Sequence, residues 1–260
     1  MFLQNLNPLL FTILMPFTES SSTTLSAETV LDKYIEAIGG RAAIEKINTK
    51  VIATTTLIPS KKQKIETTMF IKNPDKAYVV VEFKLGGKTI KSEGGRNADI
   101  VWQITPGLFR RNYKIFTGKE KELKFADLAF DTAAVSWKKY YKSISLIGEE
   151  EIDAKPCFKV AFTPFDQTYT DTICFFEKET FLIKKIIRDT YFQNHSGTAQ
   201  TYLSDYKKVD SILIPHTFKR LSEATQDLFI TIDSIRCNVD IADSKFELPK
   251  KIKELSKKAG

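Results

Sequence analysis

The 260-residue chain has little of what metal centres, disulfide frameworks and nucleotide-binding loops require. It contains three cysteines, none in a C-x-x-C pair, and two histidines, so a zinc site would lack ligands. Neither G-x-x-x-x-G-K-[ST] nor G-x-G-x-x-G occurs, so no nucleotide-binding loop is indicated. With 11 glycines and 9 prolines, long disordered linkers are not expected. We therefore expect neither a metal ion nor a cofactor.

Catalytic motifs are equally scarce. His195 lies in a polar turn and His216 in an expected strand, and no nucleophile motif such as G-x-S-x-G occurs. The densest acidic run, residues 149–151, is more typical of a solvated strand end than of a pair of catalytic carboxylates. The sequence therefore predicts that the protein is not an enzyme, and a hydrolase is kept as the lowest-ranked of three functional hypotheses.

The chain is basic, with a formal net charge of +7 and a pI near 9.1. Its Lys and Arg residues are dispersed in pairs at strand ends and turns, as at Lys61-Lys62 and Arg110-Arg111. Such pairs suit solubility and the protection of sheet edges. Nucleic-acid binding, which favours clustered basic residues with interleaved aromatics, is not predicted. A weak attraction to an anionic membrane surface is left as an alternative.

A short apolar run at residues 8–17 precedes a Ser/Thr-rich stretch that ends in Leu25-Ser26-Ala27. The run is too short for a membrane span, which needs about 20 residues. It is typical of a secretory signal, so we interpret residues 1–27 as an export signal-like segment and expect a periplasmic or otherwise exported protein. No Lys or Arg precedes the run, which indicates either a misassigned start codon or an atypical signal.

Helical spacing is clear in two places. After the candidate N-cap Ser26, apolar residues recur every three or four positions up to Gly39-Gly40, and a second short helical turn follows. Residues 118–141 have few β-branched residues and no Pro, and predict a helical insert. Residues 251–260 are expected to form a basic tail.

The rest of the chain has the pattern of short strands separated by turn residues. About eleven or twelve strands with short connections favour an antiparallel meander, and a twisted sheet of this size tends to curl. Something apolar must then fill the concave face. The expected strands cover residues 50–58, 64–72, 76–85, 88–93, 99–105, 143–151, 155–162, 169–177, 181–191, 197–207, 212–221 and 226–239.

Several expected strands are apolar on both faces, as in Tyr78–Phe83 and Phe181–Ile187. A strand with one solvated face would alternate more cleanly, so both faces are covered. Two explanations fit: a filled core, or a cavity for a lipid or similar apolar ligand, which needs little polar recognition. Cys157 and Cys174, on adjacent expected strands, are either a cross-strand disulfide or two buried thiols.

Seven segments spread over residues 28–250 resemble, in the same order, sequence marks of the LolA/LolB-like lipoprotein-localisation superfamily, to which outer membrane lipoprotein-sorting proteins belong. The segments are Tyr34–Gly40 with Ala43-Ile44 and Ile47, Asn73–Asp75, Arg96–Trp102, Gly148–Val160, Phe176–Leu182, Ser204–Pro215 and Phe246–Pro249.

The resemblance implies a single domain over residues 28–250: a mainly β, α+β fold in which one strongly curved antiparallel sheet forms a half-open barrel plugged by helices. It also implies a monomeric, exported, non-enzymatic carrier or sensor for a lipid, a lipoprotein acyl chain or another apolar ligand. An envelope membrane or a lipoprotein is then the expected partner. The alternative is a protein–protein interaction module with a filled core.

Candidate ligand-binding residues follow from the apolar strands and the expected insert. Strand faces are inferred from alternation, so a register error of one residue would invert a strand's contribution. The candidates are Met69, Val80, Trp102, Phe125, Leu128, Trp137, Phe158, Phe162 and Ile183.

Overall fold

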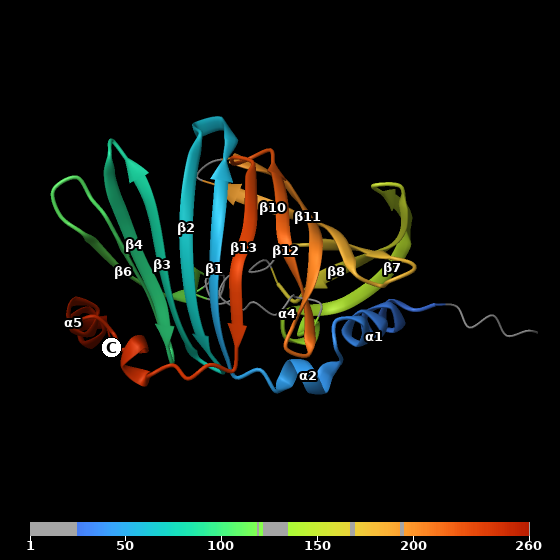
Figure 1. The fold of residues 1–260 in the computed structure, drawn as a ribbon, viewed down its shortest axis with the longest axis horizontal. Helices are drawn as coiled ribbons and strands as arrows, with labels where there is room; N and C mark the ends of the chain where they lie inside the picture. The colour runs from blue at the N-terminus through green and yellow to red at the C-terminus, as the bar shows by residue number, and fades with distance from the viewer. Residues whose placement is uncertain (1–24, 119, 122–134, 167–169, 193–194, 260) are drawn as a thin grey trace, which may run out of the picture.

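A computed structural model describes residues 25–118, 120–121, 135–166, 170–192 and 195–259, in which the dominant element is one β-sheet (Figure 1). The sheet has thirteen strands. They are β1 (Thr49–Ile58), β2 (Gln63–Lys72), β3 (Lys76–Leu85), β4 (Lys88–Asn97), β5 (Ile100–Thr105), β6 (Asn112–Phe116), β7 (Tyr141–Ile152), β8 (Lys155–Pro164), β9 (Thr172–Glu177), β10 (Ile183–Phe192), β11 (His195–Val209), β12 (Ile212–Ser222) and β13 (Leu228–Cys237).

The strand order is β6-β5-β4-β3-β2-β1-β13-β12-β11-β10-β9-β8-β7, and every pair is antiparallel. Each strand therefore pairs with its neighbour in sequence, except where β1 and β13 join the two halves. The edge strands β6 and β7 do not pair with each other, so the sheet curls without closing (Figure 1). The expected antiparallel meander is confirmed, with thirteen strands rather than about eleven.

The strand that the sequence pattern missed is β6. It has only five residues and follows Arg110-Arg111, and its first three side chains are exposed. A short, exposed edge strand shows little alternation, which explains why no strand was expected there.

The first helix, α1 (Ala27–Ala37), forms where the spacing predicts it. Ser26 is its N-cap, and the Ser26 hydroxyl accepts a hydrogen bond from the Thr29 amide at 3.1 Å. The helix ends before Gly39, which has a φ of +123°, and a Cβ there would lie 2.4 Å from the Ser211 carbonyl oxygen. The short helix α2 (Arg41–Glu45) follows.

The further helical segments among the described residues are short or terminal. The turns η1 (Pro59–Lys61) and η2 (Asp243–Phe246) are 3-10 helices. In the expected insert, α4 (Trp137–Tyr140) is helical, and so are residues 118, 120 and 121. Residues 251–260, expected as a basic tail, belong to the helix α5 (Lys250–Ala259) up to Ala259, and its Ile252 is fully buried. None of the helices among the described residues is long and apolar enough to cross a membrane.

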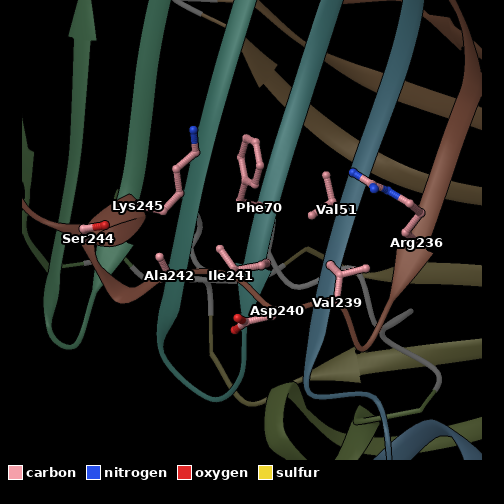
Figure 2. A pocket seen from close by; sticks show the side chains of 9 residues that line it. All are labelled: Val51, Phe70, Arg236, Val239, Asp240, Ile241, Ala242, Ser244 and Lys245. Carbon is pink, nitrogen blue, oxygen red and sulfur yellow. The ribbon is translucent and has the colours of Figure 1, made fainter.

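The two faces of the sheet are distinguished by register. Ile52 pairs with Met69 and Met69 with Val79, so these three share the face that we call the inner face, around which the sheet curls. Val51 and Phe70 share the outer face, and in Figure 2 strands of the other half of the sheet run behind them.

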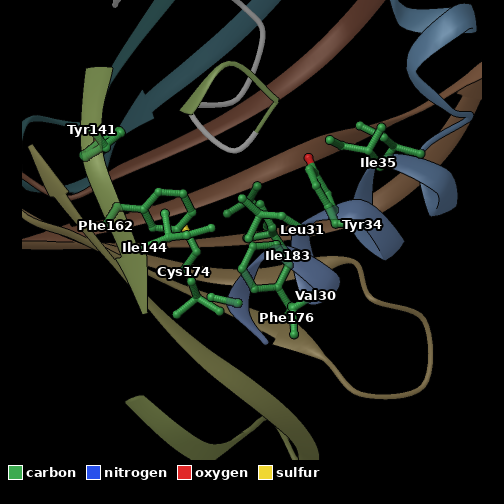
Figure 3. Close-up of a cluster of buried hydrophobic side chains, with 14 residues drawn as sticks. Val30, Leu31, Tyr34, Ile35, Tyr141, Ile144, Phe162, Cys174, Phe176 and Ile183 are labelled. Carbon is green, nitrogen blue, oxygen red and sulfur yellow. The ribbon is translucent and has the colours of Figure 1, made fainter. Parts of the chain in front are cut away.

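The largest core cluster lies between α1 and the inner face of β7–β11 (Figure 3). Leu31 and Tyr34 of α1 pack on Phe176 and Ile183, and the Tyr34 and Phe176 rings meet edge to face with centroids 5.5 Å apart. All four side chains are almost fully buried. This half of the inner face is therefore filled by the chain's own helix.

The two strand cysteines are free and lie on opposite faces. Cys157 is opposite Glu177 and belongs to an outer cluster with Phe175, whereas Cys174 is opposite Val160 in the α1 cluster. The register thus keeps the thiols apart, and the interpretation as two buried thiols is confirmed. Burial raises the pKa of the Cys174 thiol to about 12.

Candidate functional site

A hollow of about 170 Å³ lies on the inner face of β3–β6. Alternation along the strands places the side chains of Val79, Val81 and Val101 in it. We call it the inner hollow, and its lining residues are Val79, Val81, Ser92, Glu93, Gly94, Gly95, Val101, Trp102, Gln103 and Phe116.

The hollow lies where β4 has a glycine, Gly94, on its inner face. Gly94 lies between Val79 and Gln103 in register, and a Cβ there would already be 3.2 Å from the Trp102 carbonyl oxygen. Without a side chain on β4, the flanking valines surround an unfilled space. Glycine inside a strand commonly marks such a close approach.

The inner face around the hollow is apolar. Met69, Ile65, Phe83 and Ile90 on β2–β4 are half-buried, in contrast to the almost fully buried residues under α1. The polar side chains of Ser92 and Gln103 give the hollow only a few hydrogen-bonding groups. An apolar surface with a few polar groups is typical of a site for a small apolar ligand.

Three expected site residues lie on the first half of the sheet. Met69 is on the inner face of β2, half-buried against the cluster around Ile52. Val80 and Trp102 are on the outer face, where Trp102 is 3% exposed and packs beneath Ile252 of α5. On β3 and β5 the residues that face the inner hollow are one position away from those expected.

Four expected site residues belong to the α1 cluster. Phe162 and Ile183 are core residues, 1% and 0% exposed. Phe158 is half-buried and stacks on Phe181 with ring centroids 6.0 Å apart, and Trp137 of α4 packs against the same cluster.

Two expected site residues, Phe125 and Leu128, lie outside the described residues. Of the ten lining residues of the inner hollow, the sequence interpretation named Trp102 and missed the other nine. The signal that could have found the hollow is the Gly94-Gly95 pair inside a strand pattern.

Charged residues lie on both faces near the hollow: Arg96 and Lys114 are opposite Val101 and Gln103 on the inner face, and Glu93 lies on the outer face. The Tyr78 hydroxyl donates a 2.6 Å hydrogen bond to Glu93 Oε1, and Lys91 and Arg111 contact the same carboxylate at 3.2 Å. Burial alone would raise the pKa of Glu93, but these partners lower it below its ordinary value. Burial and the carboxylate raise the pKa of the Tyr78 hydroxyl. The hydrogen bond between Tyr78 and Glu93 thus links β3 to β4.

A second hollow, of about 490 Å³, lies on the outer face beneath the segment that leads from β13 to η2 (Figure 2). The Lys245 ammonium lies 4.2 Å from the centroid of the Phe70 ring. The lining residues are Val51, Phe70, Arg236, Val239, Asp240, Ile241, Ala242, Ser244 and Lys245. This second hollow is lined by side chains of both charge signs and has open sides, so it does not indicate a class of ligand.

Neither hollow is lined by a histidine or a cysteine of the described residues. His216 is buried, and its Nδ1 lies 2.8 Å from the Ile214 carbonyl oxygen of its own strand. Among the described residues, no group of three or more His, Cys, Asp or Glu side chains could hold a metal ion. Glu93 is the one titratable lining residue of the inner hollow, and its carboxylate contacts Tyr78, Lys91 and Arg111. The apolar lining side chains can bind an apolar group.

Solved structures with the same architecture identify the fold. An outer membrane lipoprotein-sorting protein domain from Vibrio parahaemolyticus superposes with a TM-score of 0.57 at 13% identity, over 85% of this chain and 97% of that one. A LolA superfamily protein from Nitrosomonas europaea gives 0.55 at 12% identity, over 86% and 98%. The chain has the fold of the LolA superfamily.

A DUF1329 family protein from Desulfovibrio piger has the same LolA-like fold, with a TM-score of 0.56 at 16% identity over 85% of this chain and 96% of that one. No protein-family model and no curated protein sequence matches the chain. At these identities the likeness concerns the fold, and function must be argued from the site.

Proposed function

We propose that the protein is a non-enzymatic carrier or sensor that binds a lipid, a lipoprotein acyl chain or a similar apolar ligand on the inner face of β2–β6. The observation that carries the proposal is the inner hollow, with the half-buried apolar side chains around it. Each CH₂ group that such a surface removes from water contributes about 0.8 kcal/mol, so an acyl chain binds without elaborate polar recognition.

The two halves of the inner face would have different roles. The helix α1 fills the half formed by β7–β11, and we propose that it acts with α4 as the plug of a half-open barrel. The half formed by β2–β6 would hold the ligand. Two fold relatives are named as a lipoprotein-sorting domain and a LolA superfamily protein, and these names support this class of ligand.

We further propose that the protein is exported and acts in the cell envelope as a monomer, with an envelope membrane or a lipoprotein as its partner. The apolar run at residues 8–17 supports export. Mass spectrometry of the N-terminus after expression in a Gram-negative host tests it. Cleavage near Ala27 is expected, and an intact N-terminus in the cytoplasmic fraction would contradict export.

Neighbouring valines on opposite faces of β3 give a matched test of the ligand site. Val81 lines the inner hollow and Val80 lies on the outer face, and both are half-buried. Val81→Asp places a carboxylate where the ligand would bind, and the desolvation of that charge should weaken binding of cis-parinaric acid more than tenfold. Val80→Asp is the control and should bind as the wild type does.

The measurement is a fluorescence titration, with melting temperatures recorded for both variants to confirm folding. Equal affinities for the two variants would place binding elsewhere. If the wild type takes up no fatty acid, and native mass spectrometry after mild extraction finds no lipid, the carrier proposal fails. The alternative, an interaction module with a filled core, is then favoured.

A further inference from the structure

Three hairpins of the first half of the sheet turn at the same end. Since β1–β6 form an antiparallel meander, the connections β1–β2, β3–β4 and β5–β6 all lie at one end of these strands (Figure 1). We call this end the hairpin rim and define it as residues 57–64, 84–88 and 106–111. The connections β2–β3 and β4–β5 lie at the opposite end.

The hairpin rim presents large apolar side chains to solvent. Leu108 and Phe109, at the tip of the β5–β6 hairpin, are 90% and 96% exposed, and Leu85 beside the β3–β4 turn is 64% exposed. The β5–β6 turn is tight, because a Cβ at Gly107 would lie 2.3 Å from the Arg110 carbonyl oxygen. Consecutive Leu and Phe residues held out on a tight turn indicate a surface that contacts something apolar.

The same rim is uniformly basic. Its three segments contain no Asp or Glu, and their Lys and Arg residues are Lys61, Lys62, Lys64, Lys84, Lys88, Arg110 and Arg111. Lys64 pairs with Glu66 at 2.8 Å and Arg111 with Glu93 at 3.2 Å; within the described ranges, no other ion pair involves these seven. The turns at the opposite end carry Asp75 and Asp99 instead.

We propose that the hairpin rim docks on an anionic lipid surface, with Leu108 and Phe109 inserted at the boundary between headgroups and acyl chains. The Lys and Arg residues would then lie at the level of the lipid phosphates. The Leu108-Phe109 pair and Leu85, on two separate basic turns, fit between lipid headgroups, whereas a protein partner would favour a contiguous apolar patch. Basic residues near an anionic bilayer add attraction that salt screens.

The rim also lies at one end of the inner face. Alternation along β3 places Val79, Val81, Phe83 and Leu85 on one face, so apolar side chains run from the inner hollow to the rim. A ligand could pass along this row between the bilayer and the hollow. The docking specifies the membrane partner of the proposed function, and this route rests on its ligand site.

Flotation of the full chain with lipid vesicles tests the docking. The wild type should float with vesicles of 30% phosphatidylglycerol in phosphatidylcholine at low salt, and only weakly with pure phosphatidylcholine. Phe109→Ser should reduce the partition coefficient at least about tenfold, on the scale of a fully buried Phe side chain. Arg110→Gln should weaken binding to the anionic vesicles alone. Ile147→Ser, at a residue of β7 that is 49% exposed, is the control and should bind as the wild type does.

Several outcomes would overturn the docking. One is a wild type that does not float with anionic vesicles, and another is equal flotation of wild type and Phe109→Ser. Concentration-dependent dimerisation that Phe109→Ser abolishes, without vesicle binding, would assign the rim to a second copy of the chain. The fatty-acid titration separates this proposal from the proposed function, because Val81→Asp should still dock and Phe109→Ser should still take up the probe.

Discussion

The helix α5 gives a sharp quantitative prediction, because one side chain anchors it. Ile252 is fully buried and packs against Trp102 and Ile104 on the outer face of β5, with Leu248 and Leu255 around it. Ile252→Ala removes buried methyl and methylene groups and leaves a cavity, a change that costs 2–5 kcal/mol in well-packed cores. At a chain terminus the helix can relax, so we expect a loss of about 3 kcal/mol in the free energy of unfolding.

Urea titration measures this loss, and the fluorescence of Trp102 locates it. The chain has two tryptophans, so a Trp137→Phe background leaves Trp102 as the only reporter. In that background Ile252→Ala should lower the melting temperature by about 6–12 °C and make Trp102 more accessible to acrylamide. Lys257→Ala, at an exposed position of the same helix, is the control and should change neither quantity.

A free energy of unfolding within about 0.5 kcal/mol of the background, with unchanged quenching of Trp102, would refute the reasoning. It would mean that residues 250–259 contribute no packing energy in solution. Quenching that increases without a loss of stability would also contradict it, because the helix and β5 would then not unfold together.

Four smaller predictions follow. Ser92→Val adds apolar contact in the inner hollow and should tighten fatty-acid binding about fourfold by fluorescence titration. The folded-state pKa of Glu93 is lowered, so its stabilisation is present above the ordinary value of 4.5 and lost as pH falls through the folded value. Glu93→Gln should therefore cost about 1 kcal/mol at pH 7, and less at pH 3, in urea titrations. Leu31→Ala should cost about 2–5 kcal/mol by the same assay, because Leu31 is 1% exposed beneath β7–β11. Cys174 should react with Ellman's reagent only after unfolding, because burial raises the pKa of its thiol to about 12.

Local patterns in the sequence were sufficient for most elements. Ser26 and Gly39 mark the ends of α1 because an N-cap and a positive φ are requirements of the chain itself. Turn residues such as Gly86-Gly87 likewise separate β3 from β4. The seven segments that resemble the LolA/LolB-like superfamily also indicated the fold, which the solved structures share.

The site was harder to predict, because alternation does not say which face of a strand is inner. Val80 and Val81 are equally apolar, and only the pairing of β3 with β2 and β4 assigns one to each face. Trp102, which was expected at the ligand, is a lining residue of the inner hollow and also packs under α5, a helix 150 residues later in the chain. The sequence around Trp102 does not indicate its contact with Ile252.

The sequence by itself thus determined twelve of the thirteen strands, the first helix and the curled antiparallel sheet, because these depend on periodicity, caps and turns within a few residues. Tertiary structure alone decided that α1 fills one half of the inner face, that Gly94 lies at a hollow in the other, and that three hairpins gather apolar and basic residues at one rim. Each of these depends on register and on contacts between distant segments, which the packing of the whole chain fixes.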